Sequence, residues 1–189
     1  MTALRNVLTL CAAAGIVALM LINAPAASAS ALRLSSPAYI NGGSIPARYT
    51  CSGAGVSPPL AWSGAPKETK SLVLILTDPD APDPKAPKTT WVHWVLYDIP
   101  ATVHKLGTGE SENLPAGTRR GENSWHRADY GGPCPPIGRH RYVHTLYALD
   151  TVLPDLHHPD RAALKSAMQG HILAKATLTA SYQKPGHGS

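Results

Sequence analysis

Apolar residues in this chain gather in short runs that prolines and glycines separate. Four of these runs predict β-strands, at residues 71–78, 91–99, 141–150 and 176–182. The run at 71–78 is almost continuously apolar, which indicates a strand buried on both faces. The chain has 18 prolines and 16 glycines, a composition that favours many short strands over long helices. We therefore predict a mostly β protein.

The core needs large side chains from residues other than phenylalanine, which the chain lacks. We expect the tryptophans to supply them together with the tyrosines: Trp62, Trp91, Trp94 and Trp125. One segment, 157–176, has helical spacing, with Leu164, Met168 and Ile172 on one face and Pro159 in the first turn. We expect this helix to cover an edge of the sheet.

The first 29 residues have the pattern of a cleaved export signal. Arg5 is followed by an apolar run from Val7 to Ile22 and then by small residues up to Ala29. The run is shorter than the roughly 20 residues of a spanning helix, so a stable membrane anchor is disfavoured. We predict a periplasmic or secreted protein with one domain over residues 30–183 and a flexible tail over 184–189.

Charge and cysteine content argue against two classes of function, nucleic-acid binding and zinc binding. Without Arg5 the chain has 16 basic residues against 12 acidic ones, and no basic run exceeds two residues, so a nucleic-acid partner is not expected. Beyond the leader two cysteines remain, Cys51 and Cys134. In an oxidising compartment an even pair indicates a disulfide, with two free thiols as the alternative. A zinc pair is disfavoured because neither cysteine has a C-x-x-C spacing.

Candidate chemistry gathers near the ends of the predicted strands. The motif "TDPDAP" at 77–82 places Asp78 and Asp80 between prolines, which alone indicates a rigid turn. The loop "DYGGPCPPIGRHRY" at 129–142 carries stiffening prolines and ends next to His140. His93 lies within a strand, where alternation puts it on the face of Trp91 and Val95, and a lone histidine there is usually structural. Two histidines with an aspartate and a stiff loop together indicate a small anion site, with imidazolium and backbone N–H donors in front and a carboxylate behind.

These motifs, with "WVHWVLYDIP" and "YTCSGAGVSPPLAW", resemble the phosphatidylethanolamine-binding protein family and its bacterial, Raf-kinase-inhibitor-like branch. The resemblance covers residues 32–182. It implies an antiparallel β-sandwich with Greek-key connections and one or two short helices. It also implies a pocket for small anionic or phosphorylated ligands, formed by ten residues: Asp78, Ala81, Pro82, Trp91, His93, Cys134, Pro135, Pro136, His140 and Tyr142.

Three functions remain open from the sequence. The first is a non-enzymatic binding protein for an anionic ligand, with no cofactor, metal or catalytic residue. The second is an interaction module that inhibits an extracytoplasmic kinase, protease or other protein partner. The third is a hydrolase or metal enzyme built on Asp78, His93 and His140. The third is disfavoured because the chain has neither G-x-S-x-G nor H-E-x-x-H.

Overall fold

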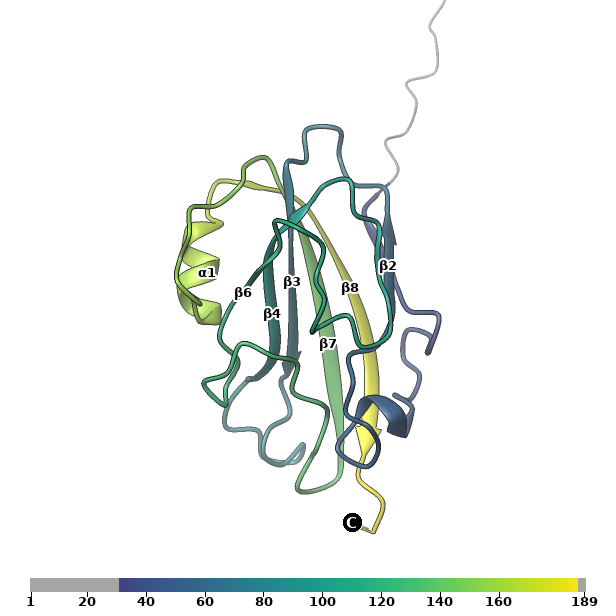
Figure 1. The fold of residues 1–189 in the computed structure, drawn as a ribbon. Helices are drawn as coiled ribbons and strands as arrows, with labels where there is room; N and C mark the ends of the chain where they lie inside the picture. The colour runs from purple at the N-terminus through teal and green to yellow at the C-terminus, as the bar shows by residue number, and fades with distance from the viewer. Residues whose placement is uncertain (1–30, 187–189) are drawn as a thin grey trace, which may run out of the picture.

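The computed structural model describes residues 31–186, so the predicted signal peptide and the last three residues of the predicted tail lie outside it. The described chain forms two antiparallel sheets and one α-helix (Figure 1). The three-stranded sheet has the order β1 (Arg33–Ser35), β2 (Leu60–Ser63) and β5 (Lys105–Leu106). The prediction of a mostly β fold is confirmed.

The five-stranded sheet has the order β6-β4-β3-β7-β8. Its strands are β6 (Arg119–Arg120), β4 (Trp91–Pro100), β3 (Ser71–Asp78), β7 (Arg139–Leu149) and β8 (Ile172–Gln183). All four strands predicted from the sequence are present here, and β8 begins four residues earlier than expected. A short 3-10 helix, η1 (Ala47–Tyr49), precedes β2 in the chain. Within residues 31–186 no helix is long and apolar enough to cross a bilayer.

The central strand β3 is buried on both faces, as its apolar run predicts. Leu72, Leu74 and Leu76 pack in an inner cluster that also contains residues of β1, β2 and β5, so the two sheets share this core. Val73 and Ile75 face an outer cluster instead. The shared core is compatible with the predicted sandwich.

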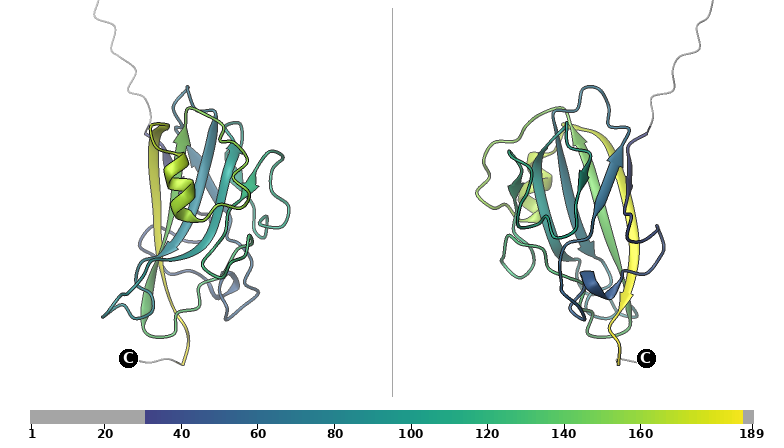
Figure 2. Two further views of the ribbon diagram at one scale, coloured as in Figure 1. Left: turned by 90° about the vertical axis from the view of Figure 1, so that its left-hand side faces the viewer. Right: turned by 45° about the vertical axis from the view of Figure 1, so that its right-hand side comes forward.

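The helix α1 (Arg161–Ala167) is shorter than the sequence pattern indicated, and two expectations about it were wrong. Asp160 caps it by accepting a hydrogen bond from the Ala163 N–H at 2.7 Å, so Pro159 precedes the helix, and Ile172 begins β8 instead. The helix also covers a sheet face and not an edge, since Leu164 packs in the outer cluster against β3 and β4. It lies on the side of the five-stranded sheet away from β2 (Figure 1), and the left view of Figure 2 brings it to the front.

The tryptophans divide into two pairs, which corrects the expectation that all four fill the core. Trp62 and Trp94 are buried in the inner cluster. Trp91 is only partly buried and the Trp125 residue is 39% exposed. These two rings instead contact each other edge to face, with centroids 5.4 Å apart, at the end of the sheet where β4 begins.

His144 on β7 is fully buried, and neither of its ring nitrogens has a hydrogen-bond partner within residues 31–186. Burial lowers the pKa of His144 to about 3. Between that value and the ordinary pKa near 6.5, the unfolded chain binds a proton that the folded protein excludes. The free energy of unfolding therefore falls as the pH falls through this window, and the full contribution is present only above pH 6.5 or so.

We expect His144→Leu to remove this acid sensitivity. At pH 5 the penalty from excluding the proton is about 2 kcal/mol, at about 1.4 kcal/mol per pH unit. The loss of unfolding free energy between pH 8 and pH 5, measured by urea denaturation, should be smaller by that amount in the variant than in the wild type. His104→Leu, which replaces an exposed histidine, serves as the control and should leave the wild-type pH dependence unchanged. Parallel curves for His144→Leu and wild type would contradict the assignment.

Candidate functional site

A cavity of about 290 Å³ lies where β3 ends and β4 and β7 begin. All ten residues that the family resemblance implied line this one cavity, although three separate stretches of the chain supply them. One further residue, Trp125, lines it as well. Most of the wall is apolar, with tryptophan and proline side chains, and the polar atoms come from Asp78, His93, His140 and Tyr142.

The "TDPDAP" turn is both a rigid corner and one wall of the cavity. The carboxylate of Asp78 accepts a hydrogen bond from the backbone N–H of Asp80 at 2.8 Å, which closes the turn on itself. Asp80 points away to the neighbouring strand, where its carboxylate accepts from the Arg141 backbone at 2.8 Å and from the guanidinium at 2.6 Å. The Arg141 side chain lowers the pKa of Asp80. Asp80 therefore fixes the turn to β7 and leaves Asp78 facing the cavity.

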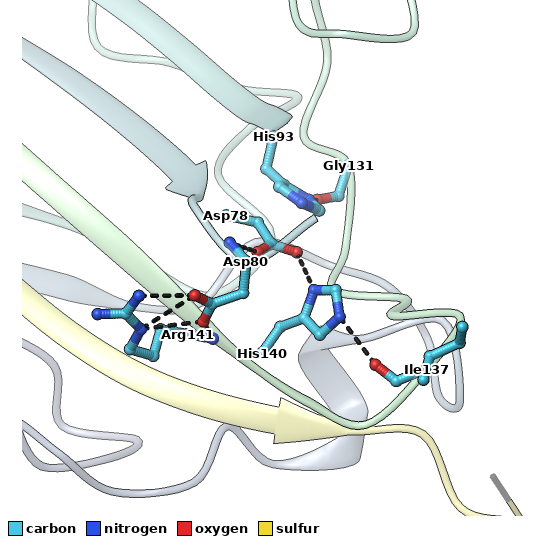
Figure 3. A network of polar contacts seen from close by, with 7 residues as sticks. All are labelled: Asp78, Asp80, His93, Gly131, Ile137, His140 and Arg141. Carbon is cyan, nitrogen blue, oxygen red and sulfur yellow. Dashed lines mark hydrogen bonds and ion pairs between the residues drawn. The ribbon is translucent and has the colours of Figure 1, made fainter. Parts of the chain in front are cut away.

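Asp78 forms the central polar contact of the site with His140, which lies at the start of β7 (Figure 3). The Asp78 Oδ2 and His140 Nδ1 atoms are 2.7 Å apart, and both side chains are almost completely buried. The other ring nitrogen, Nε2, lies 2.9 Å from the carbonyl oxygen of Ile137. A carbonyl oxygen only accepts, so Nε2 carries a proton. A second proton lies between His140 Nδ1 and Asp78 Oδ2. On the histidine it gives an imidazolium beside a carboxylate, and on the aspartate it gives two neutral groups. In both cases the Asp78–His140 pair has no net charge.

His140 consequently has no free N–H for a ligand. The hypothesis that two imidazolium groups donate to an anion is wrong for this residue, because its nitrogens are engaged by Asp78 and Ile137. The carboxylate that the sequence placed behind the histidines belongs to Asp78, and it orients His140. His140 is therefore a positioning residue, which keeps the buried Asp78 carboxylate in place.

His93 faces the cavity because β4 contains a β-bulge at this point. Trp94 pairs with Leu76 and Val92 with Thr77, so His93 is the extra residue of the strand. The bulge breaks the alternation, and the expectation that His93 shares a face with Val95 was wrong. The His93 ring contacts Tyr142, an inner-cluster residue, with centroids 5.2 Å apart, whereas Val95 belongs to the outer cluster.

A single backbone group fixes the His93 ring. Nδ1 lies 2.7 Å from the carbonyl oxygen of Gly131 and donates to it, and the Gly131 N–H donates in turn to the His93 carbonyl oxygen at 2.9 Å. Burial lowers the pKa of His93, although the Gly131 carbonyl and Asp78 oppose the shift. The ring is therefore neutral at neutral pH with its proton on Nδ1. Its Nε2 atom has no partner within residues 31–186 and can accept a hydrogen bond.

The Gly-Pro loop forms the opposite wall and is tied to the turn after η1. The sulfur atoms of Cys51 and Cys134 lie 2.12 Å apart, at bonding distance, as the cysteine count predicted. The Cys51 N–H also donates to the Pro133 carbonyl at 3.0 Å. A Cβ atom at Gly131 would collide with the Trp125 ring, so any other residue here would displace that ring. A bond that joins residues 83 apart contributes about 4–5 kcal/mol in the loop-entropy model.

Tyr142 completes the floor of the cavity. Its hydroxyl is buried without a hydrogen-bond partner within residues 31–186. Burial, and secondly the Asp78 carboxylate, raise the pKa of Tyr142, so the hydroxyl stays protonated.

Within residues 31–186, no three histidine, cysteine, aspartate or glutamate side chains are grouped so that they could hold a metal ion. Two polar side chains of the cavity are therefore left without a partner in the described chain, Tyr142 at its hydroxyl and His93 at Nε2.

Trp125 is the cavity residue that sequence reasoning assigned to the core. It lies in the long connection 121–138 between β6 and β7, where neither strand nor helix periodicity indicates which way a side chain points. Its position depends on contacts distant in sequence. The ring lies edge to face with His93, with centroids 5.1 Å apart, and Arg127 lies 5.8 Å from the Trp125 centroid. The sequence feature that could have indicated a place in the cavity is the tryptophan's position in a long loop, because such loops often carry binding residues.

Comparisons with known proteins identify the family of this chain. The family model for phosphatidylethanolamine-binding protein matches residues 35–183. A UPF0098 protein of Methanothermobacter thermautotrophicus is 43% identical over 155 residues, which cover 81% of this chain and 99% of that protein. The crystal structure of a phosphatidylethanolamine-binding protein homologue from Chlamydia trachomatis is 41% identical and has a TM-score of 0.75, with 82% of this chain and 98% of that chain covered. YbcL of E. coli is 30% identical with a TM-score of 0.74, over 82% of this chain and 99% of that chain. The chain belongs to the phosphatidylethanolamine-binding protein family.

We expect thiol titration of the unreduced, unfolded mature protein to find Cys51 and Cys134 unreactive. Each should become reactive after treatment with dithiothreitol, because the bond between them is then broken. Cys51→Ser serves as the control, since it leaves Cys134 as a free thiol that reacts without reduction. Two reactive thiols in the unreduced mature chain would contradict the pairing.

Proposed function

We propose that this family member binds a small phosphorylated or other oxyanionic ligand in the cavity and releases it unchanged. The observation that carries the proposal is His93, a neutral histidine whose Nε2 faces a largely apolar cavity without a partner within residues 31–186. The volume of about 290 Å³ is at the small end for ligand sites, which favours a headgroup-sized molecule.

The protonation of the site defines which anion fits best. The Asp78–His140 pair has no net charge, so the cavity offers no fixed positive charge when His93 is neutral. A neutral His93 accepts a hydrogen bond, and a monoanionic phosphate ester provides one from its remaining P–OH group. The proton can equally move onto Nε2, which gives an imidazolium facing a dianion. In both cases the complex contains one proton more than the free dianion and the neutral histidine together.

Donors for the ligand oxygens are available from the loop. The backbone N–H of Cys134 has no hydrogen-bond partner within residues 31–186, and Cys134 lines the cavity. The three prolines of the loop hold this wall in a fixed shape, so that little conformational entropy is lost when a ligand binds. Trp91 and Trp125 exclude water from one side, which strengthens each polar contact inside.

The same contacts argue for binding without turnover. A hydrolytic site needs a nucleophile activated by a base, and the cysteine in the cavity is bonded to Cys51. The Asp78 carboxylate and both nitrogens of His140 are engaged by the protein itself. Among the described residues that line the cavity, His93 is the single side chain with a free basic nitrogen, and no serine or threonine lies beside it.

The proposal predicts a pH-dependent affinity for phosphate monoesters. Calorimetric titration with methyl phosphate should show an affinity that falls roughly 50-fold between pH 6 and pH 8, because the monoanion is lost above its second pKa of about 6. Dimethyl phosphate, a monoanion without a P–OH group, should bind about tenfold more weakly at pH 6. Methyl phosphate should be recovered intact after incubation.

His93→Ala tests the residue assignment. The variant should bind methyl phosphate about tenfold more weakly at pH 6 and should no longer prefer it over dimethyl phosphate. His104→Ala, on the exposed surface, is the matched control. His140→Ala is a poor probe, since it leaves Asp78 buried without its partner and should cost about 3–5 kcal/mol of stability. Equal affinity for both esters at every pH, in folded protein, would refute the site.

We also propose that the protein acts outside the cytoplasm, on the basis of the leader pattern in residues 1–29. Expression of the full chain in a bacterial host should yield a mature periplasmic protein that begins near Ser30, as determined by N-terminal sequencing. The variant Val17→Arg places a charge within the apolar run and should block processing. A wild-type chain that keeps Met1 and stays in the cytoplasm would contradict export.

A further inference from the structure

The cavity wall formed by Cys134, Pro135 and Pro136 is held to the rest of the described domain without backbone hydrogen bonds of its own. None of these three residues makes a backbone hydrogen bond within residues 31–186, although all three line the cavity. Pro135 is buried, and the neighbouring Pro133 and Ile137 each have a carbonyl that accepts one hydrogen bond. The sulfur–sulfur bond to Cys51 is therefore the covalent cross-link that fixes this wall to the rest of the described domain.

The same bond joins two residues at the surface of the protein. Cys51 and Cys134 are both exposed, in contrast to the buried polar residues on the cavity floor. A disulfide between two residues at the surface can be attacked by a thiolate without prior unfolding of the protein. Cys134 is thus both exposed to solvent and part of the cavity wall.

We propose that the Cys51–Cys134 bond is a thiol-exchange site whose reduction loosens the cavity wall and weakens ligand binding. The reductant is a dithiol. One of its thiolates attacks a protein sulfur, the Cys51–Cys134 bond breaks, and the other cysteine leaves as a thiolate that takes up a proton. The second thiol of the reductant then attacks the mixed disulfide. The protein gains two electrons and two protons and carries two thiols, and the reductant leaves as a cyclic disulfide.

The contacts that do not involve the bond restrict the change to the wall. Gly131 keeps its two hydrogen bonds to His93, and the Tyr130 hydroxyl donates to the Tyr49 carbonyl at 2.8 Å. The two clusters of the core contain neither cysteine. Reduction should therefore leave the sheets folded while residues 134–136 gain freedom. A ligand must then order these residues again when it binds, which lowers the affinity by roughly tenfold.

The test rests on the proposed function and uses methyl phosphate as the probe. Calorimetry at pH 6 compares oxidised wild type, wild type held in dithiothreitol, and wild type reoxidised after removal of the reagent. We expect roughly tenfold weaker binding in the reduced sample, recovery after reoxidation, and an unchanged far-ultraviolet circular dichroism spectrum. Oxidised protein that fails to bind would count against the proposed function itself. Equal affinity in samples shown by thiol titration to be oxidised and reduced would overturn the thiol-exchange proposal alone.

The variant Cys51→Ser separates the bond from the chemistry of the reagent. It leaves Cys134 in the wall, and its affinity should equal that of reduced wild type and should not respond to dithiothreitol. Global unfolding of both Cys51→Ser and reduced wild type would also overturn the proposal, since the bond would then support the whole domain and not this wall. Met168→Leu, a conservative change in the outer cluster away from the cavity, is the control and should respond as wild type does.

Discussion

A carboxylate buried at the end of the central strand is the constraint on which the site depends. Asp78 ends β3, a strand covered on both faces, and a buried carboxylate is strongly destabilising unless the protein provides hydrogen bonds and a partner. The neighbouring strand β7 provides that partner where it enters the sheet, since His140 stands there beside Asp78. His140 then needs an acceptor for its second nitrogen, and the Ile137 carbonyl supplies it. The position of the loop follows from these requirements.

The rest of the cavity is arranged around this neutral pair. Because Asp78 and His140 satisfy each other, the basic nitrogen left to face a ligand belongs to His93, which a β-bulge turns toward the cavity. The Gly131 carbonyl holds the His93 ring, and because Gly131 has no Cβ atom, the Trp125 ring can pack closely against it. One loop thus contacts both histidines, the first through Gly131 and the second through Ile137. A change in that loop reaches both ends of the site, which is why the attachment of the loop through Cys134 matters to binding.

The sequence predicts the parts of this structure that local patterns encode. The apolar run of β3, the cysteine pair and the residues of the cavity could be identified, the last through their resemblance to a family. Three features could not be predicted, and each depends on contacts between distant segments. The bulge at His93 arises from pairing with β3, Trp125 is oriented by Gly131 and His93, and Ile172 joins β8 because sheet pairing with Leu149 overrides its helical spacing. The different roles of His93 and His140 likewise follow from the groups that each ring meets, the Gly131 carbonyl for His93 and both Asp78 and the Ile137 carbonyl for His140.

The separation in sequence between the partners of the site has a consequence for folding. Asp78 and His140 are 62 residues apart, Asp80 and Arg141 are 61 apart, and β3 must be in register with β7 before either contact can form. Non-local strand pairing of this kind is the slow part of folding in β proteins, because the chain loses the entropy of a long loop before the contacts reward it. We therefore expect the cavity to form late in folding, since a chain that has formed only its hairpin of β3 and β4 lacks the contacts made by β7. A ligand in the cavity then stabilises only those chains in which β3 and β7 have paired.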